Sequence, residues 1–167
     1  MIFLKKGYKI ICSGGYGKCP SLQLKKEKLQ EMGKNMIPNK RNAAQAYKMN
    51  AIKTASPARL TSMLYDAAVR FTDTSIELME KEPDNYEEIN KNLKKAQDCI
   101  MELRMGLDFK YPVAGEFEKV YDYIYRRLVE GNMKKDVDII KDTLTHINTM
   151  RDTWREVVRL NKEGKAK

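Results

Sequence analysis

Histidine is the side chain most often used for metal binding and proton transfer, and this chain contains one, His146. Di-iron sites in helical bundles need a Glu-x-x-His motif on each of two helices, so a single histidine excludes that site. It also excludes a haem held by two histidines. His146 lies next to the apolar positions of a helical pattern rather than on them. We therefore expect a half-exposed polar side chain there instead of a ligand.

The other residues with reactive or phosphate-binding potential lack the required spacing. Cys12 and Cys19 have no second pair and no nearby histidine, which is not a zinc pattern. Cys99 falls inside a helical pattern, where a buried and inert thiol is expected. Residues 14–18 are glycine-rich and end in lysine, but no strand precedes them and no helix opens directly after them. Three cysteines without a disulfide framework fit a reducing cytosol.

Paired carboxylates occur at two places, Glu87-Glu88 and Asp136 with Asp138. Both pairs lie at predicted helix starts, where negative side chains favour the positive end of the helix dipole. This structural role accounts for both pairs without general acid–base chemistry. We find no catalytic constellation, which disfavours one interpretation of the chain, a helical enzyme, and no cofactor is expected.

Aromatic and methionine side chains remain as candidates for a binding function, because the chain has nine tyrosines and ten methionines. Tyr121, Tyr123 and Tyr125 occupy alternate positions of one predicted helix, so they cannot all face the same core. Most such residues are core or core edge. Tyrosine and methionine also suit adaptable surfaces that bind apolar helical segments.

The clearest helix start in the chain is at Ser56-Pro57. Serine is a good N-cap, because its hydroxyl accepts from a free backbone N–H, and proline suits the first helical position. This helix is predicted to continue to Lys81 and to stop before Pro83. Its expected apolar face consists of Leu60, Met63, Leu64, Ala67 and Phe71.

Three further long helices and one short helix follow from the same periodicity. The short helix is expected over 42–52. The next long helix is expected to be capped by Asp84, with Glu87 completing a capping box. Another follows Pro112 and ends near residues 131–132, and the last spans 134–161. Their apolar positions are Ile89, Leu93, Ala96, Ile100, Leu103 and Leu107; then Phe117, Tyr121, Ile124 and Leu128; then Val137, Ile140, Leu144, Ile147, Trp154 and Val158.

Short connections between long helices make neighbours antiparallel. The predicted fold is all-α, an antiparallel up-and-down four-helix bundle with a short additional N-terminal helix. We expect Ile100 and Leu103 to be buried in its core.

The net charge of +9 is concentrated at the N-terminus. Residues 1–40 hold nine lysines and two acidic residues, whereas residues 41–167 hold 23 basic and 21 acidic residues. We therefore divide the chain into a basic N-terminal extension that is expected to be disordered or not part of the core (1–40), a helical domain (41–161) and a frayed tail (162–167). The extension leaves one alternative function open, a basic helical protein that binds nucleic acid or an anionic membrane through residues 1–40. No stretch approaches the ~20 apolar residues that a membrane span needs.

The segment around the first long helix carries the most specific pattern. Tyr47, Ile52 and Thr54-Ala55-Ser56-Pro57 precede Leu60 and Met63-Leu64-Tyr65-Asp66. This order resembles the opening signature of the FliS family of flagellar export chaperones. Later blocks are similar to the same family in the same order: Ala96, Ile100, Glu102-Leu103 and Leu107-Asp108; Val120-Tyr121-Asp122-Tyr123, Arg127-Leu128 and Gly131-Asn132; and Trp154. The resemblance extends over residues 42–160.

The resemblance implies a cytosolic chaperone that is not an enzyme and uses neither ATP nor a cofactor. Its client would be the C-terminal segment of flagellin, which is disordered when free. Binding would prevent premature polymerisation and keep the client export-competent. Other flagellar export or regulatory proteins are further possible partners, with no nucleic acid and no membrane insertion. Residues 47–52 would lie near the client groove and could cover it when it is empty. We expect the flagellin contacts at Tyr47, Ile52, Leu60, Leu64, Tyr65, Tyr121 and Tyr123.

Overall fold

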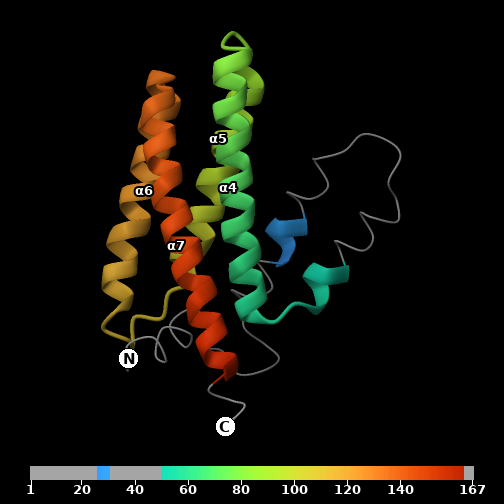
Figure 1. The fold of residues 1–167 in the computed structure, drawn as a ribbon, viewed down its shortest axis with the longest axis vertical. Helices are drawn as coiled ribbons and strands as arrows, with labels where there is room; N and C mark the ends of the chain where they lie inside the picture. Colours follow the sequence, from blue (N-terminus) through green and yellow to red (C-terminus); the bar gives the residue numbers. More distant parts are fainter. Residues whose placement is uncertain (1–25, 31–49, 164–167) are drawn as a thin grey trace.

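The computed structural model of the chain describes residues 26–30 and 50–163, and every regular element in these two ranges is a helix. Short helical stretches at 26–30 and 50–54 precede four long helices (Figure 1). The long helices are α4 (Pro57–Lys81), α5 (Tyr86–Met105), α6 (Ala114–Lys134) and α7 (Val137–Glu163). The predicted all-α class is confirmed for these residues. Of the short helix expected over 42–52, residues 42–49 lie outside the described ranges.

Each long helix packs against two others: α4 and α6 both contact α5 and α7. Side-chain contacts show that α4 and α7 run in opposite directions. Trp154, late in α7, donates to the carbonyl of Ala58 at the start of α4. Lys141, early in α7, pairs with Glu80 at the end of α4 at 2.6 Å.

The predicted start and end of α4 are confirmed. The Ser56 hydroxyl accepts from the backbone N–H of Arg59 at 3.3 Å, and Pro57 is the first helical residue. The helix ends at Lys81, two residues before Pro83.

The predicted cap of α5 is wrong by one residue. Asn85, not Asp84, is the N-cap, and its side-chain oxygen accepts from the N–H of Glu88 at 3.4 Å. Asparagine caps as well as aspartate, so composition alone does not choose between neighbours. The shift leaves Glu87 and Glu88 in the first turn, where, as predicted, their negative charges favour the positive end of the helix dipole.

The junction between α6 and α7 differs from the prediction by two to three residues. Instead of stopping near 131–132, α6 continues to Lys134, and Lys135 then turns the chain in the left-handed region at φ 55°. The Asp136 carboxylate accepts from the N–H groups of Asp138 at 2.9 Å and Ile139 at 3.1 Å, which starts α7 at residue 137.

The apolar seams predicted from the sequence form the core. Ile100 and Leu103 have no exposed surface, as expected. Late in α7 the buried residue is Val157, while the predicted Val158 is only partly buried. Leu29 also joins this core at 6% exposure, although it lies within the 1–40 extension. The domain boundary itself stays a prediction.

Candidate functional site

The residues expected to contact flagellin are distributed unevenly between core and surface. Tyr123 is 43% exposed, and Tyr47 lies outside the described residues. The others are buried: Ile52, Leu60, Leu64, Tyr65 and Tyr121. In this conformation Tyr123 is therefore the described member of the set with a large accessible area, and the contact assignment stays a prediction.

Tyr65 and Tyr121 meet inside the core. Their hydroxyl oxygens are 2.5 Å apart and their ring centroids 6.5 Å apart. Tyr65 belongs to α4 and Tyr121 to α6, two helices that are not among the closely packed pairs. Burial raises the pKa of both phenols, so both hydroxyls stay protonated. One hydroxyl can then donate a hydrogen bond to the other. The pair is a polar link across the core.

The helical residues 50–54 lead into the start of α4 and contribute to the core. Ile52 is 4% exposed and belongs to the same apolar core as α4. The Ile52 carbonyl accepts from the N–H of Ala55 at 3.3 Å, and this turn directly precedes the N-cap of α4. Next to this segment lie residues 26–30, because the Lys26 ammonium donates to the Lys53 carbonyl at 2.8 Å. Figure 1 shows both short segments on one side of the long helices.

His146 has the half-exposed position that the sequence predicted. Its side chain is 45% exposed, and its ring packs edge-on against Tyr123 with centroids 5.3 Å apart. Its Nε2 lies 3.9 Å from an oxygen of Asp142. Across residues 26–30 and 50–163, no three His, Cys, Asp or Glu side chains are grouped as a metal site would require.

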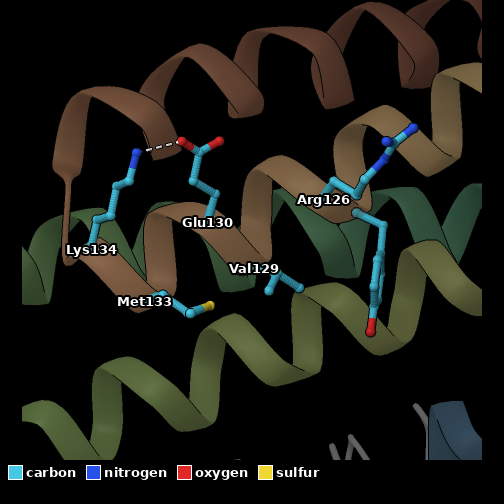
Figure 2. A pocket seen from close by; sticks show the side chains of 6 residues that line it. Arg126, Val129, Glu130, Met133 and Lys134 are labelled. Atoms are coloured by element: carbon cyan, nitrogen blue, oxygen red, sulfur yellow. Dashed lines mark hydrogen bonds and ion pairs between the residues drawn. The ribbon is translucent and has the colours of Figure 1, made fainter.

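A shallow depression of about 290 Å³ lies on α6. Its lining residues are Tyr125, Arg126, Val129, Glu130, Met133 and Lys134. Figure 2 shows the Glu130–Lys134 ion pair on one side of α6, with Val129 and Met133 on the other side, toward the neighbouring ribbon. The ion pair measures 2.7 Å, and Met133 is 81% exposed. An apolar floor with a charged rim suits the apolar face of a partner helix.

Large apolar side chains are exposed at both ends of the α5–α6 pair. Tyr86 and Met133 lie at one end, where Lys135, directly after α6, contacts Asn90 early in α5. Met105 and Phe109 lie at the other end, around the α5–α6 loop. The sequence predicted exposed tyrosine and methionine side chains, but no pattern in it indicated Phe109 or Val129. Neither residue belongs to the predicted apolar face of a helix. Which other apolar side chains remain exposed depends on how the helices pack.

Among the described residues, no helix is at once long enough and apolar enough to cross a bilayer. The family comparison adds the decisive observation. The family model described as "Flagellar protein FliS" matches residues 40–161, which is most of the chain. The chain belongs to the FliS family. The family resemblance predicted from the sequence blocks is thereby confirmed.

The relatives that match carry the name flagellar secretion chaperone FliS. The protein of Bacillus subtilis (strain 168) is 32% identical over 124 residues, covering 74% of this chain and 92% of the relative. The protein of Salmonella typhimurium is 27% identical over 117 residues, covering 68% of this chain and 85% of the relative. The protein of Vibrio cholerae is 24% identical over 123 residues, covering 70% and 89%. The family match begins at residue 40, so the helical residues 26–30 precede it.

Proposed function

We propose that this chain is a cytosolic flagellar secretion chaperone that binds the disordered C-terminal segment of flagellin. Binding prevents premature polymerisation and keeps the client export-competent, without enzymatic activity or a cofactor. Other flagellar export or regulatory proteins are further partners in this proposal. The family match over residues 40–161 is the single observation that carries it.

The architecture that we infer for this task is an antiparallel up-and-down four-helix bundle over residues 41–161. Residues 1–40 are a basic extension of which 26–30 touch the bundle, and the predicted tail starts later than residue 162, because α7 continues to Glu163. Two features support client binding. Residues 50–54 lay an apolar side chain, Ile52, over the core, and a cover of this kind can be exchanged for a client helix. Exposed apolar side chains such as Met133 extend the available surface.

Calorimetry with a peptide of the C-terminal flagellin segment tests the proposal on the full chain. We expect one-to-one binding, a gain of helix in the peptide and a negative heat-capacity change, because apolar burial should dominate. Affinity should fall little with salt. Phosphate-dominated binding falls steeply with salt, so a steep dependence would favour the nucleic acid or membrane alternative.

A double substitution, Tyr47→Ala with Ile52→Ala, tests the proposed contacts. These residues precede the long helices, so the helices should still form while client affinity or exchange rate changes. Lys53→Ala is the matched control, since Lys53 is exposed and adjacent in sequence. Identical binding by wild type and the double variant would remove these two residues from the site. Absence of any binding to the peptide would overturn the proposed function.

A further inference from the structure

A buried carboxylate on α5 depends on a cation from outside the helical bundle. The Glu102 side chain is 1% exposed, and its Oε1 is the oxygen that the Lys28 ammonium contacts. Its charge is balanced by the Lys28 ammonium, whose nitrogen lies 2.9 Å away. A buried charge is costly unless an opposite charge accompanies it. While residues 26–30 cover it, the Glu102 carboxylate is stabilised by the Lys28 ammonium.

The cation belongs to a segment that is seated by three contacts. Lys28 reaches Glu102, Leu29 enters the apolar core, and Lys26 donates to the Lys53 carbonyl. Contact with the Glu102 carboxylate raises the pKa of Lys28, so the lysine stays charged. Together these contacts define the Glu102 site, the surface of the bundle that residues 26–30 cover.

Glu102 lies inside the part of the chain that matches the FliS family, whereas Lys28 lies before it. The acidic half of the pair is thus part of the family domain, and the basic half is supplied by an added segment. A phosphate backbone is excluded from this site, because it would face the carboxylate. A helix that presents a cation beside an aliphatic side chain fits it, as Lys28-Leu29 does.

We propose that the Glu102 site binds a partner protein helix carrying a lysine or arginine next to a large aliphatic residue, and that residues 26–30 occupy the site until such a partner displaces them. The N-terminal extension is then an internal competitor for this surface. This interaction is separate from the flagellin contacts proposed above, and it holds or fails without them.

The probe is a synthetic peptide of residues 21–34, titrated by calorimetry into the full chain. In wild type the tethered segment competes at the high effective concentration of an intramolecular ligand, so added peptide binds weakly. Lys28→Glu in the full chain places two carboxylates together and releases the tethered segment. That variant should bind the peptide about tenfold or more tightly than wild type. Lys94→Glu, an exposed lysine on α5, is the matched control and should bind like wild type.

The acidic side is tested by adding Glu102→Gln to the Lys28→Glu chain, which should reduce peptide affinity about tenfold or more. If that chain does not fold, the peptide itself carrying Lys28→Glu gives the same test against the Lys28→Glu chain, and it should fail to bind. Equal peptide binding by wild type and the Lys28→Glu chain would overturn the proposal. So would binding that ignores the charge at Glu102 or at Lys28 of the peptide. None of these titrations contains flagellin, so their outcome is independent of the proposed client.

Discussion

Removing one hydroxyl of the Tyr65–Tyr121 pair should destabilise the protein more than removing both. Tyr65→Phe keeps the ring but leaves the Tyr121 hydroxyl without its 2.5 Å partner in a fully buried place. An unsatisfied buried hydroxyl costs about 1–3 kcal/mol, and Tyr121→Phe should cost a similar amount. Replacing both tyrosines removes both polar groups and leaves apolar rings of the same shape, which is close to neutral.

The free energy of unfolding is measured by urea titration followed by circular dichroism for wild type, both single variants and the double variant. We expect the double variant to be more stable than the sum of the single effects by about 2–6 kcal/mol, because both single losses of about 1–3 kcal/mol disappear when the two contacting hydroxyls are removed together. Tyr123→Phe is the matched control on α6, since Tyr123 is 43% exposed, and it should change stability by less than about 0.5 kcal/mol. Additive effects of Tyr65→Phe and Tyr121→Phe would show that the two hydroxyls do not depend on each other and would refute the reasoning.

Three further outcomes follow from the buried core. Leu103→Ala should lower the free energy of unfolding by about 2–5 kcal/mol in the same urea titration, because Leu103 is fully buried; a loss below about 1 kcal/mol would contradict its burial. Gly131→Ala should destabilise by about 1 kcal/mol, because the new Cβ would lie 2.4 Å from Cδ1 of the buried Ile140, which outweighs the gain in helix propensity. Gly115→Ala, with nothing within 4 Å of the new Cβ, is its control on α6 and should be neutral or stabilising. Burial raises the pKa of the Cys99 thiol from 9.0 to about 12. The unfolded thiol ionises first as pH rises, so stability is full below about pH 9 and declines from there to about pH 12. Replacing Cys99 with alanine should therefore reduce the loss of stability between pH 8 and pH 10.5 by about 2 kcal/mol, and an unchanged pH profile would show that the thiol is accessible to solvent.

Helix positions were predictable because local chemistry determines them. Ser56-Pro57 has one good interpretation as a helix start, and the steps of three and four residues through Ile100 and Leu103 identify one buried face. Where two adjacent residues can both cap a helix, as Asp84 and Asn85 can, the sequence does not decide between them. The end of α7 shows the same limit: Val157 and Val158 are chemically equal, and packing selects the first.

The candidate sites were less predictable, because they depend on pairs that are far apart in the sequence. Tyr65 and Tyr121 are separated by 56 positions, and no local pattern indicates that their hydroxyls meet. A tyrosine on the apolar face of a helix can be buried or exposed. Burial is favoured when its hydroxyl finds a hydrogen-bond partner inside the core. The pairing of Lys28 with Glu102 was hidden for a similar reason. The sequence indicates a short basic amphipathic helix over residues 21–34 through Leu22, Leu29 and Met32, but a lysine-rich segment is usually solvated, and no local pattern indicates that this one packs on the core.

Trp154 is the only tryptophan of the chain, and its position makes it an optical probe of one junction. Its indole N–H lies 3.3 Å from the Ala58 carbonyl and 3.1 Å from the Ser62 hydroxyl, in the first turns of α4 that follow residues 50–54. At 3% exposure the ring should emit at short wavelength. A ligand that lifts residues 50–54 and loosens the beginning of α4 would shift this emission to the red, whereas a ligand on the α6 depression would leave it unchanged. The unmodified protein can thus report, by its own fluorescence, which of its surfaces a partner has engaged.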